Sequence, residues 1–509
     1  MNKINVELLD KHRNYLDKYK PNDLYWGIGI ENETYLKMTK NMKIEPNNYY
    51  EKYARRERYS IDYFKSSYKD NIYQNNIKKL KLPERVPILI NAHTFLQTDI
   101  NNEHKTTYSK NPTINSKFNG TTIYEYICAK DPYFKEEYMK SFIFDGDTIE
   151  FITTNFYKVT IYDVIKELKE NKEKFINKLN KIFLENNILK DFGEVKFCKN
   201  NYPFASFMTN IGRYSIFNNM TYHFNFTLPT KLNSDCYIDD YNLFINQHKN
   251  AIHLIQWLEP ILIANYGSGD ILYEVDKKLT NSSQRCAKSR FISIGTYDTD
   301  ELKAGKILQI DTSNNHLSNY NNWWFNKYYE TSHYKKEEKI GVDINFHKHK
   351  NHGIEIRIFD YFDEDKLEKV LTFIVLLLDF SLENNIKSPS KNDIWNNFVV
   401  NILFDKNYKF DDIIKNEYNK IFSSLDEFKQ DFIDSFDFFE KLYDSLKRKY
   451  ENKGICYTKM VKTCIQEVKI DDIIDDNKEI KEDKSLEETI INNSNINSNK
   501  RKNKCCIIM

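Results

Sequence analysis

The sequence has no excess of one charge, no long uninterrupted apolar run and no regular spacing of cysteines. Its 75 Lys and Arg residues against 74 Asp and Glu residues leave a net charge of +1, so no general field attracts nucleic acid or an acidic surface. No apolar run reaches the roughly 18 residues of a membrane-spanning helix. The eight cysteines among 509 residues show neither metal-ligand spacing nor a disulfide framework, which favours a reducing compartment.

The composition of the sequence is typical of a globular protein. With 40% hydrophobic residues, the chain can bury a sizeable core. Composition and periodicity predict an N-terminal helical lead at 1–23, a main body of strands and helices at 24–385, a helical extension at 386–465 and a tether at 466–509. The tether is acidic and then Asn- and Ser-rich, with too little apolar content to fold.

Apolar periodicity predicts the elements of the body, because alternation is typical of strands and spacing by three and four is typical of helices. We expect strands at 24–35, 86–95 and 221–228, a strand-turn-strand unit at 141–153, a hairpin formed by 340–346 and 353–359, and helices at 161–189, 241–266 and 366–382. We also expect Pro229 to stop its strand and Pro260 to kink or restart its helix.

The end of the sequence carries a pattern for lipid attachment. Residues 506–509, Cys-Ile-Ile-Met, fit the C-a-a-X motif, in which a terminal Met favours a farnesyl group on Cys506. Cys505 offers a second, palmitoyl site, and four basic residues lie within 500–504. A lipid chain plus basic residues suffices for stable membrane residence. We therefore expect a cytoplasmic protein that is peripheral on the cytosolic face of a membrane; the alternative is an unmodified tail in which these residues meet by chance.

Candidate site residues stand two apart on predicted strands. Because side chains alternate along a strand, residues two apart project from the same face. In the segment 27–33, Gly-Ile-Gly-Ile-Glu-Asn-Glu, the two glycines share a face with Glu31 and Glu33. We expect the glycines to clear space for a bulky, negatively charged ligand held through a divalent metal.

Three further segments carry polar residues in the same manner. Glu355 and Arg357 share a face and suit metal and phosphate, respectively. His223 and Asn225 share another face, and Glu150 lies within an apolar run, where a carboxylate needs a partner. For any single pair an ordinary antiparallel sheet with one solvated face is an adequate explanation, and His223 alone is typical of a structural histidine. The combination of residue types favours one shared cavity.

In their order along the chain, these segments resemble the glutamate–cysteine ligase and carboxylate–amine ligase (amidoligase) family. The resemblance rests on 27–33, on the Glu150 segment, on 223–225 (His-Phe-Asn) and on 355–357 (Glu-Ile-Arg). It covers roughly residues 24–382.

Two more segments support the resemblance. The segment 256–268, from Gln256 through Glu259 to a Tyr-Gly-Ser end, is similar to a helix and loop of that family. Arg290, with Tyr-Asp-Thr-Asp at 297–300, is similar to its arginine and Asp-Thr-Asp stretch, although Lys303 stands where the family has an arginine.

The resemblance implies an α+β fold of the glutamine synthetase kind, in which a curved, mainly antiparallel sheet forms a funnel with helices outside. It also implies ATP and two or three Mg²⁺ (or Mn²⁺) ions as cofactors. Carried over by motif, the metal ligands are Glu31, Glu33, Glu150 and Glu355, the nucleotide or substrate contacts are His223, Asn225, Gln256 and Glu259, and the catalytic arginines that meet phosphate or substrate carboxylate are Arg290 and Arg357.

The activity implied is formation of an amide bond between a carboxylate and an amine through an acyl phosphate. The partners are then small-molecule or peptide substrates and, through the tail, a membrane surface; no nucleic acid is expected. The carboxylate donor could be the γ-carboxylate of glutamate. Two alternatives remain: a catalytically inactive, membrane-tethered interaction protein that retains the fold, and a phosphotransferase of the guanidino-kinase type.

Overall fold

The computed structural model describes residues 20–43, 85–90, 123–307 and 344–462, apart from short stretches within the last two ranges. The predicted N-terminal helix up to residue 19, the tether and the lipidation residues Cys505 and Cys506 lie outside the described residues. Those predictions remain predictions. Within the described part the protein combines antiparallel sheets with helices, which confirms a mixed α+β fold.

The central element is a six-stranded sheet in the order β12-β13-β9-β1-β5-β4. Every neighbouring pair in it is antiparallel. Its strands are β1 (Leu24–Thr34), β4 (Phe142–Asp145), β5 (Thr148–Ile152), β9 (Thr221–Lys231), β12 (Ile344–Phe346) and β13 (Ile354–Asp360). The chain therefore brings segments more than 300 residues apart into one sheet.

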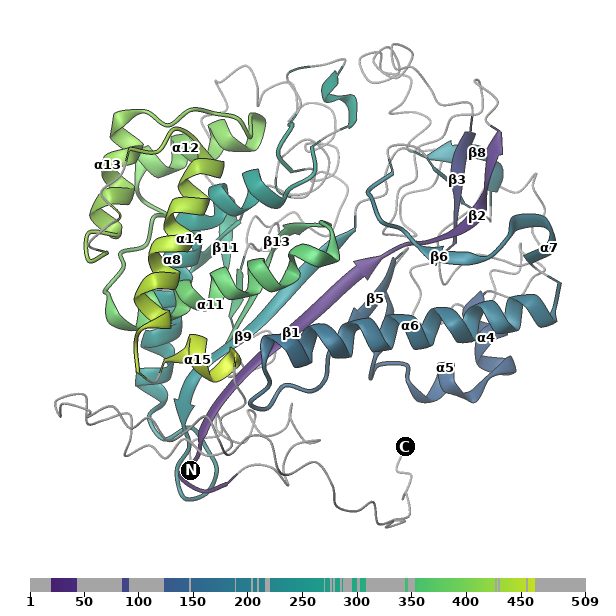
Figure 1. Ribbon diagram of the computed structural model, residues 1–509, viewed down its shortest axis with the longest axis horizontal. Helices are drawn as coiled ribbons and strands as arrows, with labels where there is room; N and C mark the ends of the chain where they lie inside the picture. Colours follow the sequence, from purple (N-terminus) through teal and green to yellow (C-terminus); the bar gives the residue numbers. More distant parts are fainter. Residues whose placement is uncertain are drawn as a thin grey trace.

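A second sheet continues from the first, because β1 runs on into β2 with only Tyr35 between them (Figure 1). Its order is β6-β2-β3-β7-β8, and β3 and β7 are parallel while the other pairs are antiparallel. Its strands are β2 (Leu36–Lys43), β3 (Arg85–Ile90), β6 (Val195–Phe197), β7 (Ala205–Phe207) and β8 (Asn210–Ser215). A separate hairpin consists of β10 (Gly295–Asp298) and β11 (Lys303–Ile307).

Helices cover one face of the six-stranded sheet, here called the helix face. The helix α6 (Ile161–Glu185) packs against β1 and β5, α8 (Tyr241–Tyr266) packs against β9 and β13, and α11 (Leu367–Glu383) contacts both helices. Figure 1 shows α6 running alongside β1, with α8 and α11 grouped beside β9 and β13. The short helices α4 (Ile123–Lys130) and α5 (Pro132–Glu136) pack at the β4 side, and α7 (Leu189–Phe192) follows α6.

The remaining helices form a further layer on α8 and α11. They are α12 (Asp393–Phe404), α13 (Asp412–Ile421), α14 (Ser435–Glu451) and α15 (Tyr457–Lys462), with the short turns η2 (Ile271–Glu274) and η5 (Glu364–Lys366) elsewhere. α12 and α14 pack on α8, and α14 and α15 pack on α11. One continuous cluster of buried apolar residues joins the sheet to this layer, so the boundary predicted at 385/386 is not a break in the core.

Alternation along the strands explains which face is covered. Ile28 and Ile30 of β1, Phe224 of β9 and Ile356 of β13 are buried on the helix face. These residues face the apolar stripes of the helices, and their burial supplies most of the free energy that holds the layers together. The opposite face of the sheet is left for the polar residues of the same strands.

The structure corrects two expectations about prolines, the stop of the strand at Pro229 and the restart of the helix at Pro260. β9 does not stop at Pro229 but runs to Lys231, because the register of β9 against β1 shifts next to this residue and a proline at a bulge removes no ladder hydrogen bond. α8 is one helix through Pro260 and is not restarted there.

No helix among the described residues is long and apolar enough to cross a membrane.

Candidate functional site

The pairing of the central strands places the predicted polar residues on one face, opposite the helix face. Residues directly opposite each other in an antiparallel pair point to the same side of the sheet. The register pairs Glu33 with Glu150, Glu31 with His223, and Glu355 with Asn225. Four adjacent strands, β5, β1, β9 and β13, thus contribute to one polar row.

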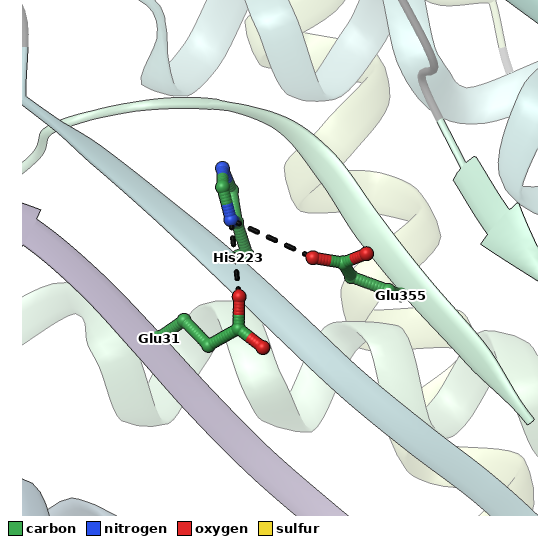
Figure 2. A group of neighbouring side chains, drawn as sticks. All are labelled: Glu31, His223 and Glu355. Atoms are coloured by element: carbon green, nitrogen blue, oxygen red, sulfur yellow. Dashed lines mark hydrogen bonds and ion pairs between the residues drawn. The ribbon is translucent and has the colours of Figure 1, made fainter. Parts of the chain in front are cut away.

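His223 stands at the centre of this row (Figure 2). Its Nδ1 lies 3.3 Å from Oε2 of Glu31 and 3.6 Å from Oε1 of Glu355, and its Nε2 lies 3.8 Å from Oε1 of Glu33. Glu31, His223 and Glu355 each offer one atom that could bind a metal ion, and these three atoms lie within 4.8 Å of one another. Three carboxylates from two strands therefore converge on one imidazole; we call these four residues the carboxylate cluster.

Neighbouring polar groups fix the carboxylates in place. The Nδ2 amide of Asn225 donates to Oε1 of Glu31 at 3.1 Å. The Nδ2 amide of Asn345, on β12, donates to Oε2 of Glu355 at 3.2 Å. Arg357 forms an ion pair with Oε1 of Glu355. These contacts orient the oxygens before any ligand binds, as a preorganised site requires.

The electrostatics of the site are dominated by negative charge that is withdrawn from water. The side chains of Glu33, Glu355 and His223 are each exposed by 2% or less, and that of Glu31 by 13%. Burial alone would lower the pKa of Arg357, but the carboxylates of Glu355, Glu33 and Glu31 outweigh it and raise that pKa above its ordinary value. Three buried carboxylates near one arginine are the arrangement that a bound cation would stabilise.

The two glycines of β1 have a different role from the one expected. A Cβ added to Gly27 would meet the ring of Phe156 at 2.1 Å, and one added to Gly29 would meet the same ring at 2.8 Å. The space that the glycines leave on the polar face is therefore filled by Phe156, which is only 5% exposed. The expectation that the glycines make room for a ligand is wrong, since a neighbouring aromatic side chain takes that room.

The other predicted residues are placed as follows. Glu150 lies on β5 directly opposite Glu33 and is half-buried. Gln256 and Glu259 are fully buried within α8, the helix that packs on the opposite side of the sheet from the carboxylate cluster. Arg290 lies outside the described residues.

Two residues of the site were missed at the sequence level. Asn345 orients Glu355, and the alternation Ile344-Asn345-Phe346 in the predicted hairpin is the signal that would have placed it on the polar face. Phe156 belongs to the loop after β5. No periodicity in that loop indicates that its ring covers the glycines.

The comparisons with known proteins supply a relative without a described activity. No family model matches the chain. The chain is similar to Uncharacterized protein R704 of Acanthamoeba polyphaga mimivirus, with 42% identity over 408 residues, which are 79% of this chain and 71% of the relative. Identity of this extent indicates a common fold over most of both chains.

Proposed function

Since the chain belongs to the same family as Uncharacterized protein R704 of the mimivirus, a relationship that assigns no chemistry, we propose a function from the carboxylate cluster itself. The proposed function is an ATP- and Mg²⁺-dependent ligase that joins a carboxylate to an amine. The observation that carries it is the convergence of Glu31, Glu33 and Glu355 on His223, beside Arg357.

The types of side chain support a hard divalent cation in this place. Carboxylate oxygens are the ligands that magnesium prefers, and an imidazole is compatible with manganese. Glu31, Glu33 and Glu355 would hold the metal, and Glu150 stands beside Glu33 in the sheet to complete the set. Bound magnesium would neutralise negative charge on ATP phosphate oxygens.

In the proposed reaction, an oxygen of the substrate carboxylate attacks the terminal phosphorus of ATP, and ADP leaves. The amine nitrogen then attacks the acyl carbon of the resulting acyl phosphate, the C–N bond forms, and phosphate departs while the nitrogen loses a proton. Arg357 stays charged throughout, because the neighbouring carboxylates raise its pKa. Its guanidinium is suited to holding a phosphate or carboxylate in place.

The fold supports the same proposal at a coarser level. The resemblance implies a funnel-shaped sheet with the site on its inner face, and the polar row lies on the face of an antiparallel sheet opposite the described helices α6, α8 and α11. We propose that the six-stranded sheet is the wall of that funnel.

One observation favours the alternative of an inactive relative. Phe156 closes the polar face over Gly27 and Gly29, on the same face of β1 as Glu31 and Glu33. If the ring stays there, the cluster would hold a metal ion for stability or for binding to another molecule, and no turnover would occur.

The experiment that tests the proposal is a thermal-shift titration with Mg²⁺ and ATP, together and separately. We expect the melting temperature of the wild type to rise by about 3 °C or more, because a ligand that binds only the folded state stabilises it. Glu33→Gln should lose this rise. Glu170→Gln, which changes a 64% exposed side chain on α6, should keep it and serves as the matched control.

The ligand-free proteins give a second readout. Glu33→Gln removes one of three neighbouring buried carboxylates, so we expect it to melt at or above the temperature of the wild type. Release of ADP with pairs of carboxylates and amines then separates a ligase from a metal-binding relative. Equal stabilisation of the wild type and Glu33→Gln by Mg²⁺ and ATP would refute the metal site.

A further inference from the structure

A pocket of about 950 Å³ lies apart from the carboxylate cluster, between α6, β2, β6 and the segment that follows β13. It belongs to the helix face, since its most buried basic residue, Lys172 of α6, donates to Oδ1 of Asn32 at 3.1 Å. Asn32 alternates with Glu31 and Glu33 along β1 and therefore points to the other side of the sheet. The pocket and the cluster are thus separated by the strand itself.

A buried lysine of the pocket forms an ion pair with a partly exposed glutamate. Lys172 is 7% exposed, forms an ion pair with Glu364 of η5, and has its Nζ 4.9 Å from the centre of the Phe197 ring. A buried lysine of this kind is costly unless a partner holds its charge. Glu364 is one such partner and is 27% exposed at the side of the pocket.

A second cation lines the pocket without a carboxylate partner among the described residues. Nζ of Lys37, on β2, donates to the hydroxyl of Tyr202 at 2.7 Å and lies 5.1 Å from the centre of that ring. Lys37 is half-buried. Among the described lining residues, Lys37, Lys172 and Glu364 are the charged ones that are not fully exposed, and they leave one positive charge in excess when Lys172 is protonated.

The charges at the rim do not cancel this excess. Three lysines and four carboxylates line the outer part, and all are exposed. Exposed charges are screened by water and salt, whereas half-buried ones are screened much less. The field felt by a ligand inside the pocket is therefore set by Lys37, Lys172 and Glu364.

Aromatic and apolar side chains complete the walls. Phe197, Tyr202 and Tyr361 line the pocket together with Ile176 and Val195. Flat rings beside a cation suit a ligand that has both a planar apolar part and an anionic group. The volume is that of a site for a small organic molecule.

We propose that this pocket binds a small organic anion, an aromatic phosphate or carboxylate, whose charged group lies between Lys37 and Lys172 and whose plane lies against the tyrosine rings. Burial lowers the pKa of Lys172 to about 7, so an anion beside its amine favours the protonated form. Such a ligand would also contact the amine of Lys172, which donates to Asn32. Asn32 lies between Glu31 and Glu33 along β1.

The test is isothermal titration calorimetry of the full chain, without divalent metal, using phenyl phosphate as the probe. We expect saturable binding to the wild type, and weaker binding of inorganic phosphate, which lacks the planar part. Lys37→Met should reduce the affinity for phenyl phosphate about tenfold or more, because a charged hydrogen bond is lost. Lys40→Met is the matched control, since Lys40 lies on the same strand, donates to the carbonyl oxygen of Lys190 and does not line the pocket.

Glu33→Gln separates this pocket from the carboxylate cluster. It should bind phenyl phosphate as the wild type does, whether or not the proposed ligase activity exists. Absence of binding to the wild type at millimolar phenyl phosphate, or equal binding to Lys37→Met and the wild type, would overturn the proposal. Loss of binding in Glu33→Gln would also overturn it, because the probe would then occupy the cluster.

Discussion

Single atoms decide the packing on the polar face of β1. Gly27 and Gly29 lack the Cβ that would strike the ring of Phe156. At Gly27 the added atom would also lie 2.8 Å from the carbonyl oxygen of Phe156, and a backbone atom moves less easily than the end of a ring. The two glycines are therefore not equivalent, although the sequence presents them alike.

Substitution of these glycines tests that difference. We expect Gly27→Ala to lower the free energy of unfolding by about 1–3 kcal/mol, as overpacking does, and Gly29→Ala to lower it by less. Urea unfolding measures both. When Phe156 is also replaced by alanine, Gly27→Ala and Gly29→Ala should lower the free energy of unfolding by much less. An equally large decrease there would mean that the ring is not the obstacle.

At the scale of elements, the last described helix is held by a residue far away in the sequence. α15 has six residues, too short for stability by itself. Asp379 of α11 accepts hydrogen bonds from the backbone nitrogens of Tyr457 at 2.8 Å and Thr458 at 2.7 Å, and from the Thr458 hydroxyl. The hydroxyl of Tyr457 in turn donates to the carbonyl oxygen of Gly27 at 3.1 Å, so α15 is tied to β1 as well.

Removal of this cap should release α15. Asp379→Ala leaves buried backbone donors without an acceptor, and we expect a loss of about 2 kcal/mol in the free energy of unfolding. Hydrogen exchange should accelerate at the amides of 457–462 more than in α6.

Because burial raises the pKa of Asp379, the native state binds its proton at a higher pH than the unfolded state does. The free energy of unfolding of the wild type should therefore exceed that of Asp379→Ala by the same amount or by more as the pH decreases from 7 toward 5.

At the scale of the molecule, the helical extension shares one core with the sheet. Trp395 of α12 and Tyr418 of α13 are fully buried against Trp257 of α8, and the Tyr418 hydroxyl donates to the carbonyl oxygen of Trp257 at 2.7 Å. Without these contacts α8 would expose a large apolar surface to water.

A chain shortened to end at residue 385 tests this dependence. We expect it to aggregate or to unfold without a cooperative transition, because the layer that covers α8 and α11 is missing. Size-exclusion chromatography and thermal unfolding followed by circular dichroism would show this. A monomeric, cooperatively folding product would instead establish 24–385 as an independent domain.

The sequence alone determined which residues share a face. Alternation in 27–33, 221–228 and 353–359 predicted the strands and separated their apolar side from their polar side, since the period of a strand is a local property of the backbone. The positions of α6, α8 and α11 followed from apolar spacing in the same manner. Local patterns did not reveal the bulge that accommodates Pro229 or the continuity of α8 through Pro260.

Only the tertiary structure decided which strands are neighbours and what fills the space between them. The order β13-β9-β1-β5 brings Glu355, His223 and Glu31 together, and no periodicity within one strand contains that order. Nor does any local pattern show that Phe156 covers the glycines or that Lys172 and Lys37 line one pocket. Pairing and packing between distant segments depend on the whole set of surfaces that must be buried at once, which is why they appear only in the folded chain.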